Sequence, residues 1–354
     1  MRIRPIHIIL ALLMAGCVLA ACAENRAEVS MSGGVDRAAV QQTAETMAPL
    51  ETEPVGGETE PAETEPAETE PLETEPVDAT VPSARQEDGK WVYSIPEPDR
   101  SGLNDLSSVN ALSKALFSDA AGTDWYPGKT ERNLQTGEVT YVWDRAKDTL
   151  ELLDKYGAIY RKNEDQKVAY LTFDCGYENG YTGKILDVLK EKNAPGIFFV
   201  VGDYVDSAPE LVKRMHEEGH LIGNHTDNHP NMVTDVDAQG FIKEITTLEN
   251  KVKALIPDIE PMLYWRPPYG ACSEWTLAMS QKLGLTAVMW SWAHYDYAVD
   301  AQPEVAASLE KAKKGLHDGV VYLFHCVGQT NVDILGDLID FIRAEGYEIR
   351  PICE

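Results

Sequence analysis

The chain has 354 residues, 44% of them hydrophobic, and a formal net charge of −27. A chain this acidic, with no basic run to displace counterions from phosphates, is not expected to bind nucleic acid. Twelve acidic residues lie between Glu45 and Asp78, and without them the net charge would still be −15.

Residues 1–22 have the pattern of an export signal. Arg2 and Arg4 precede an almost wholly apolar stretch over residues 6–22, an arrangement typical of a secreted protein. Residues 19–22 read Leu-Ala-Ala-Cys, which resembles a bacterial lipobox that would leave Cys22 lipidated after cleavage. The alternatives are a plain signal peptide or an uncleaved anchor. We expect an extracytoplasmic protein attached to the membrane by a lipid.

Residues 23–84 form an acidic low-complexity region. Glu-Thr-Glu-Pro occurs at 51–54, 58–61, 63–66, 68–71 and 73–76, and no Lys or Arg lies between Ala38 and Ala84. Such a segment has no apolar period to bury, so it is expected to be disordered. Proline and like-charge repulsion should keep it extended, as a tether that spans the cell wall.

Residues 85–154 form a lead-in of unknown role. Residues 91–96 are expected to be extended, 106–116 show weak helical spacing, and 141–160 are a better helix candidate. The sequence leaves open whether this part packs against the rest of the chain or forms a separate cap.

Residues 155–354 alternate between short apolar runs and amphipathic stretches. Strands are predicted at 168–173, 196–201, 220–224, 285–292, 319–325 and 347–352. Helices are predicted at 182–192, 209–218, 237–256, 274–283, 303–314 and 333–344. This alternation indicates an α/β fold with a parallel sheet, open or closed into a barrel.

Polar residues suited to hydrolysis follow three of these strands. Asp174 comes after 168–173, His225 after 220–224, and His325 ends 319–325. Sites of α/β barrels collect at that end of the sheet. His225 and His229 are four residues apart and would share one face if their segment were helical. Neutral imidazoles suit zinc, iron, cobalt or nickel.

Five motifs occur in order: Thr-Phe-Asp-Cys-Gly (172–176), His-Thr-Asp-Asn-His-Pro (225–230), Arg-Pro-Pro-Tyr-Gly (266–270), Trp-Ser-Trp-Ala-His-Tyr-Asp-Tyr (290–297) and Leu-Phe-His (323–325). Together they resemble the polysaccharide deacetylases of the NodB type. The resemblance implies a deformed (β/α) barrel over 155–354. The continuation Tyr-Glu-Asn-Gly (177–180) is similar to the branch that deacetylates muramic acid on the way to the δ-lactam of spore peptidoglycan.

The resemblance also implies roles for the residues on the base side of the site. Asp174 would be the general base, and Arg266 would pair with it and lower its pKa. The backbone at Tyr269 would help to hold the acetyl oxygen. His225 and His229 would bind a divalent metal ion, zinc or another transition metal, with water or substrate completing the shell.

On the acid side, the resemblance makes His325 the proton donor to the leaving amine and Asp296 the residue that orients it. Tyr297 stands where the family usually has Trp, which indicates a pocket wall of different shape. His294 has no counterpart in the family motif and is expected to line the cleft or lie on the surface.

Position 175 departs from the family pattern. The usual second Asp, a metal ligand, is replaced by Cys175, which could be a thiolate ligand or a neutral small residue. Cys272, Cys326 and Cys353 make up a count that permits two disulfides. We interpret these four mainly as buried free thiols, because a large domain does not need disulfides for stability.

The resemblance implies metal-assisted hydrolysis of the N-acetyl group of N-acetylmuramic acid in peptidoglycan, in strands from which the stem peptide has been removed. The first alternative is deacetylation of N-acetylglucosamine in peptidoglycan or of another acetylated glycan. A second is a lipid-anchored glycan-binding module without catalysis, suggested by the change at Cys175.

Overall fold

The computed structural model describes residues 81–115, 129–142 and 147–354. The predicted signal and lipobox, and the tether up to residue 80, lie outside the described residues. Within the described part, no helix has the length and apolar character needed to cross a membrane.

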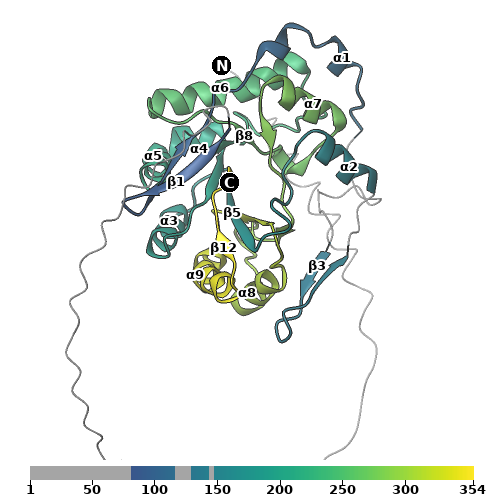
Figure 1. The fold of residues 1–354 in the computed structure, drawn as a ribbon. Helices are drawn as coiled ribbons and strands as arrows, with labels where there is room; N and C mark the ends of the chain where they lie inside the picture. Colours follow the sequence, from purple (N-terminus) through teal and green to yellow (C-terminus); the bar gives the residue numbers. More distant parts are fainter. Residues whose placement is uncertain (1–80, 116–128, 143–146) are drawn as a thin grey trace, which may run out of the picture. The chain divides into compact units, whose positions relative to one another are not determined.

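A parallel sheet forms the centre of the fold (Figure 1), with strand order β10-β11-β5-β6-β7-β8-β9 and β12 added beside β5. The strands are β5 (Val168–Cys175), β6 (Ile197–Val200), β7 (Leu221–Asn224), β8 (Tyr264–Trp265), β9 (Thr286–Ala287), β10 (Trp292–Ala293), β11 (Val320–His325) and β12 (Glu348–Ile349). Every pairing within it is parallel. The α/β class predicted from the sequence is confirmed.

The sheet curls into a deformed barrel because a single stretch of chain, 286–293, pairs with strands at both ends of the order. At its start, the Val288 N–H donates to the Trp265 carbonyl beside β8 (2.8 Å), and near its end the Ser291 N–H donates to Val321 of β11 (3.1 Å). The predicted strand 285–292 is thus two short strands, β9 and β10. The chain turns from one neighbour to the other between them, so no continuous strand forms.

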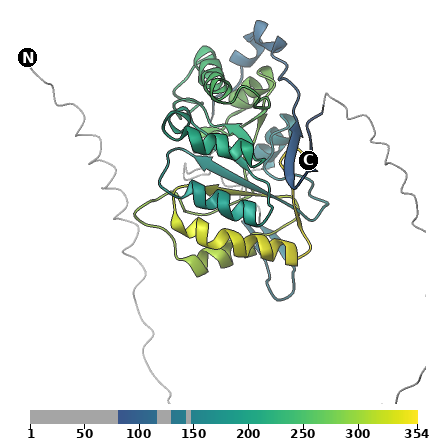
Figure 2. The ribbon, with the colours of Figure 1, turned by 90° about the vertical axis from the view of Figure 1, so that its left-hand side faces the viewer.

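Helices cover the outer face of the sheet. They are α3 (Thr182–Glu191), α4 (Gly202–Ser207), α5 (Pro209–Glu217), α6 (Ala238–Leu255), α7 (Glu274–Lys282), α8 (Val305–Lys314) and α9 (Gln329–Ala344). Figures 1 and 2 show α9 lying beside α8 and α3, which it contacts. In α6, Asp237 caps the first turn by accepting from the Gly240 N–H, which explains the predicted start.

Strand β5 shows how the sequence separates the two faces of the sheet. Leu171, Phe173 and Cys175 belong to one apolar cluster, which also holds the buried apolar residues of α3 and α9. Tyr170 belongs to the second cluster, and Asp174 follows it on the same face because strand side chains alternate. Asp174 therefore faces the interior of the barrel, at its carboxyl-terminal mouth.

The lead-in contains two hairpins and short helices. These are β1 (Ser83–Glu87) with β2 (Lys90–Ser94), β3 (Lys129–Arg132) with β4 (Val139–Val142), η1 (Ser101–Asn104), α1 (Ser107–Asn110) and α2 (Lys147–Lys155). Buried Tyr93 and Val109 join the second apolar cluster, and the Tyr93 hydroxyl donates to the Gly219 carbonyl (2.8 Å). The described lead-in therefore packs against the barrel domain.

Three expectations for this part are corrected. Strand β1 begins at Ser83, inside the predicted tether, because Ser83–Glu87 pair with Lys90–Ser94. Of the helix predicted over 141–160, the structure describes α2 at Lys147–Lys155, and Val139–Val142 form a strand, as a β-branched and aromatic sequence favours. The helical spacing at 106–116 forms only α1, a single turn, within the described residues.

Candidate active site

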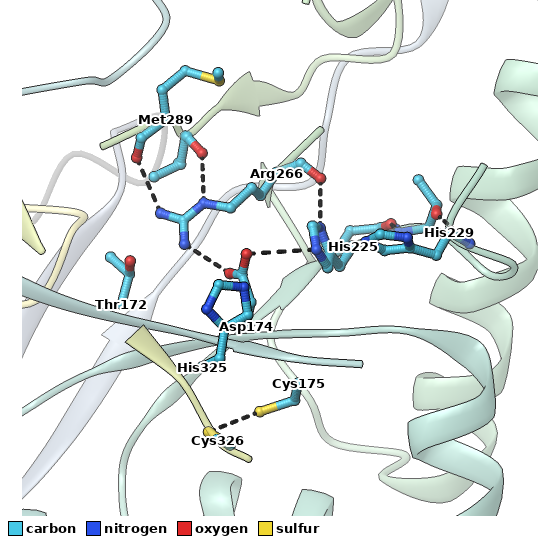
Figure 3. Close-up of polar contacts among 12 residues, drawn as sticks. Thr172, Asp174, Cys175, His225, His229, Arg266, Met289, His325 and Cys326 are labelled. Atoms are coloured by element: carbon cyan, nitrogen blue, oxygen red, sulfur yellow. Dashed lines mark hydrogen bonds and ion pairs between the residues drawn. The ribbon is translucent and has the colours of Figure 1, made fainter. Parts of the chain in front are cut away.

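Asp174 lies at the end of β5 and is almost fully buried, with an exposed fraction of 6%. Its Oδ1 accepts a hydrogen bond from Arg266 Nη1 at 2.7 Å, and its Oδ2 lies 3.5 Å from His225 Nε2 (Figure 3). Burial by itself raises the pKa of this carboxyl, but the charge of Arg266, with further contributions from His225 and His325 when these are protonated, outweighs burial and lowers the pKa below its usual value. Asp174 is therefore a carboxylate at neutral pH.

Arg266 is completely buried just after β8, and every part of its guanidinium is held. Nε donates to the Val288 carbonyl (2.9 Å) and Nη2 to the Met289 carbonyl (3.0 Å), while the group lies 4.3 Å from the centre of the Phe199 ring. Because these contacts fix the fork, Nη1 points at Asp174. The pairing expected from the sequence is present in the structure.

His225 and His229 lie together at the end of β7, with ring centres 4.8 Å apart. Since a carbonyl can only accept, His225 Nδ1 carries a proton and donates it to the Arg266 carbonyl (2.8 Å), which leaves Nε2 with a free lone pair. Burial lowers the pKa of both histidines, that of His229 to about 4. Both imidazoles are therefore neutral at neutral pH.

The segment that carries these two histidines is a loop, and the helical arrangement considered from the four-residue spacing is wrong. Thr226 and His229 have left-handed backbone angles (φ 70 and 53), and the His229 N–H donates to the Thr226 hydroxyl (3.0 Å). These two left-handed residues and the hydrogen bond between them bring His229 back towards His225.

Tyr269 lies next to this pair, in the short helix η2 (Pro268–Gly270). Its backbone is left-handed (φ 61), the residue is 57% exposed, and its ring centre is 4.6 Å from that of His229. The two prolines before it, Pro267 and Pro268, restrict the backbone at this turn. Tyr269 therefore lies at the rim of the site, beside the histidines.

His325 ends β11 and lies directly opposite Asp174 in the strand register. Its Nδ1 donates to Asp296 Oδ1 (2.7 Å), and its backbone N–H donates to Asp296 Oδ2 (2.8 Å). Burial lowers the pKa of His325, but the adjacent Asp296 carboxylate more than offsets this effect and the pKa is raised. The pKa of Asp296 itself is lowered, because the charge and hydrogen bonds of its histidine neighbours outweigh its burial.

Asn331, in the first turn of α9, completes this group and was not predicted from the sequence. Its Nδ2 donates to Asp296 Oδ2 (2.6 Å) and to the His325 carbonyl (2.9 Å), and its Oδ1 accepts from His294 Nε2 (2.9 Å). His294 lines the cleft and is largely buried, so it belongs to the cleft and not to the outer surface. An Asn in the first turn of an apolar helix carries no sequence signal for such a role.

A cleft of about 800 Å³ is lined by Asp174, His225, His229 and His325. Four half-exposed tyrosines line it, and these are Tyr177, Tyr269, Tyr295 and Tyr297. The Tyr297 ring centre is 5.6 Å from that of His325, at the position where a Trp was expected in the motif. Aromatic faces around a polar centre suit the apolar faces of sugar rings.

The sequence pattern of the family described as polysaccharide deacetylase matches residues 161–288. The peptidoglycan-N-acetylmuramic acid deacetylase PdaA of Bacillus subtilis is 40% identical over 209 residues, which are 59% of this chain and 79% of PdaA. An uncharacterised 30.6 kDa protein of Geobacillus stearothermophilus is 43% identical over 59% of this chain and 78% of its own length. The chain belongs to the polysaccharide deacetylase family.

Solved structures agree with this assignment. The structure of Bacillus subtilis PdaA, a family 4 carbohydrate esterase, superposes on this polysaccharide deacetylase with a TM-score of 0.59 and 37% identity, covering 65% of this chain and 94% of PdaA. A family 4 carbohydrate esterase from Bacillus anthracis gives 0.54 and 33% identity, over 68% and 96% of the two chains. The predicted barrel of the NodB type is confirmed.

The deacetylase has its unusual cysteine on the far side of the sheet from the cleft. Cys175 follows Asp174 on β5, so its side chain points to the opposite, helix-covered face, where it is fully buried and its Sγ lies 3.2 Å from Cys326 Sγ (Figure 3). Of the two alternatives left open for Cys175, this position favours a neutral small residue over a thiolate metal ligand.

Proposed function

We propose that this deacetylase removes the acetyl group of N-acetylmuramic acid residues in peptidoglycan, as a step towards muramic δ-lactam. The observation that carries the proposal is the pairing of Asp174 and His325 across adjacent strands of one cleft, in a chain 40% identical to PdaA. Their side chains would lie on either side of a bound acetamide, as a base for water and an acid for the amine.

The segment Tyr-Glu-Asn-Gly (177–180) supports muramic acid as the substrate. Asn179 Nδ2 donates to the Val327 carbonyl (2.8 Å), and Glu178 Oε2 accepts from the buried Tyr204 hydroxyl (3.0 Å). These bonds hold the loop against the end of β11 and place Tyr177 in the cleft wall. The motif that distinguishes this branch therefore shapes the substrate cleft itself.

In the proposed mechanism, Asp174 takes a proton from the attacking water. Arg266 keeps this carboxylate charged and correctly oriented. The developing oxyanion is stabilised near the backbone of Tyr269, where stabilisation in the transition state lowers the barrier. Protonated His325, held by Asp296, then gives its proton to the sugar nitrogen, and acetate leaves.

His225 and His229 fit a divalent metal ion. Both rings are neutral at neutral pH, and the hydrogen bond from His225 Nδ1 leaves Nε2 free as a ligand atom. Among the described residues no group of three or more His, Cys, Asp or Glu side chains forms a metal site, so water or substrate would complete the shell. When bound, the ion would polarise the acetyl carbonyl and lower the pKa of water.

The location proposed for the deacetylase is outside the cytoplasm, facing the cell wall. PdaA acts on peptidoglycan by its name, and residues 1–22 have the pattern of a lipoprotein signal. We propose a lipid anchor at Cys22, with residues 23–84 reaching from the membrane towards the glycan strands.

Acetate release from peptidoglycan tests this function. Full-length deacetylase is incubated with peptidoglycan whose stem peptides an amidase has removed, and with intact peptidoglycan, with and without added divalent ions. We expect release from the amidase-treated strands alone, and more with a divalent ion present. Equal release from both would move the substrate to N-acetylglucosamine, and none from either under any ion would indicate a glycan-binding module.

The dependence of the deacetylation rate on pH tests the role of His325 as the proton donor. Since His325 must be protonated and its pKa is raised by Asp296, activity should fall as the pH rises through that raised value. In Asp296→Asn the raising charge is lost, so we expect the alkaline limb of kcat to move down by about one pH unit or more. The exposed Asp300→Asn, in the same loop, serves as the control and should leave the limb in place.

A further inference from the structure

Two cysteines that the mechanism does not use lie beside the proposed base and acid. Cys175 follows Asp174 at the end of β5, and Cys326 follows His325 directly after β11. Both side chains are fully buried on the helix-covered side of the sheet, with their Sγ atoms 3.2 Å apart. Figure 3 shows the two sulfur atoms facing each other, away from His225 and His229.

The backbone around this pair suits a disulfide bond. His325 lies opposite Asp174 in the parallel register, and the Cys326 N–H donates to the Asp174 carbonyl (3.2 Å), so Cys326 continues the pairing beside Cys175. Neighbouring strands lie about 4.8 Å apart, and a disulfide needs Cα atoms roughly 4.4 to 6.8 Å apart. Both side chains leave the same face, so a bond requires only a small closure of the sulfur atoms.

We propose that Cys175 and Cys326 form a disulfide in the exported protein, linking the strand that carries the base to the strand that carries the acid. Each thiol gives up its proton, and the two electrons pass to the disulfide of an exported thiol–disulfide oxidoreductase, which becomes a dithiol. The oxidising location rests on the proposed cell-wall function.

The bond must form while the chain folds. In the folded protein neither sulfur is exposed, and burial raises the pKa of the Cys175 thiol, which disfavours the reactive thiolate. Once formed, the disulfide would be protected from reductants for the same reason.

The position of the disulfide gives it a structural role in the site. β5 ends at Cys175 and β11 at His325, so the backbone ladder between these strands stops there. A covalent bond at this point would prevent the two strand ends from separating, and would thereby hold Asp174 and His325 at a fixed spacing. Cys175 and Cys326 are 151 positions apart in the sequence, and closing a loop of that length restricts the unfolded chain strongly.

Peptide mapping tests the bond without reference to activity. Full-length protein exported by a bacterial host is denatured with an alkylating agent present, then digested with trypsin without reduction. Cys175 and Cys326 fall in separate tryptic peptides, 168–184 and 315–343, and Cys272 and Cys353 fall in two others. We expect the first two peptides to be joined, at a mass lower by two hydrogen atoms, and to separate on reduction.

Alkylation of both Cys175 and Cys326 in the exported protein would overturn the proposal, as would a bond from either one to another cysteine. Because the thiol state is read directly, this failure is distinguishable from failure of the proposed substrate, which is read as acetate release.

Thermal unfolding provides a second readout. Cys326→Ala should lower Tm by about 10 °C, and Cys175→Ala by the same amount, with no further loss in the double variant. Reduction under denaturing conditions followed by refolding should lower the Tm of the unsubstituted protein but leave Cys326→Ala unchanged. Cys272→Ala replaces a fully buried cysteine in the segment just before α7, and this matched control should remain sensitive to reduction. Additive losses from the two single variants, or no effect of reduction, would contradict the bond.

Discussion

Asp174→Asn is expected to lower kcat/KM for acetate release by about a thousandfold, within the range of about 10² to 10⁴ typical of a general base. The amide has the volume of the carboxylate and can still accept from Arg266 Nη1, so the site should keep its shape. It cannot take a proton from water. Because this base acts during the chemical step, the loss should appear mainly in kcat and only weakly in KM.

The matched control is Asp203→Asn. Asp203 also lines the cleft but is exposed, in the first turn of α4, and within the described residues it forms no hydrogen bond or ion pair with Asp174 or His325. Its replacement should change kcat/KM by less than about threefold, as for a carboxylate without a part in proton transfer. Steady-state rates on amidase-treated peptidoglycan give both values, and circular dichroism checks that the fold is retained. An Asp174→Asn variant with more than a tenth of the normal kcat would remove Asp174 from the role of base.

The position of the site could be predicted from the sequence because its residues lie at the carboxyl ends of apolar strands. Asp174, His225 and His325 each come directly after an apolar run, and in a parallel sheet such positions meet at one edge. The structure brings the first two to 3.5 Å and places the first and third opposite each other in register. The apolar runs predict the strands, and the ends of the strands predict where these three side chains lie.

The shortest strands were not predicted from the sequence, for a physical reason. Strands β8, β9 and β10 have two residues each, too few to show an alternation. The predicted single strand at 285–292 appeared continuous because both halves are apolar, although each half pairs with a different neighbour. Only the tertiary pairing separates them.

The second group of misses arose from contacts distant in the chain. Asn331 reaches Asp296 over 35 positions, and nothing near either residue indicates that contact. The spacing of His225 and His229 would place both on one face of a helix, but the left-handed backbone at Thr226 bends the segment into a loop. In both cases the surrounding fold, and not a local preference, determines the arrangement.

Arg266→Leu is expected to lower the free energy of unfolding by about 3 to 5 kcal/mol near neutral pH, the cost typical of removing one partner of a buried ion pair. The guanidinium is fully buried and donates to Asp174 and to two backbone carbonyls. Without it, those acceptors lose their partner and the Asp174 carboxylate is buried with less compensating charge. Urea unfolding followed by fluorescence measures the change, and the partly exposed Arg350→Leu, whose ion pair with Glu348 lies at the surface, should cost less than about 1 kcal/mol.

The free energy of unfolding lost in Arg266→Leu should also depend on pH, because Asp174 titrates differently with and without the arginine. In the natural protein the folded pKa of Asp174 is lowered, so its contribution to stability is present above the unfolded pKa and is lost as the pH falls through the folded value. Without Arg266, burial should raise the folded pKa above the unfolded one, and stability should then fall as the pH rises between the two. The difference between the two proteins should therefore grow from about pH 4 to about pH 7. Adding Asp174→Asn to Arg266→Leu removes the buried charge, so the double variant should recover part of the lost free energy of unfolding. A double variant less stable than Arg266→Leu alone would contradict this. It would show that Arg266 stabilises the fold through its contacts with backbone carbonyls and not through the ion pair.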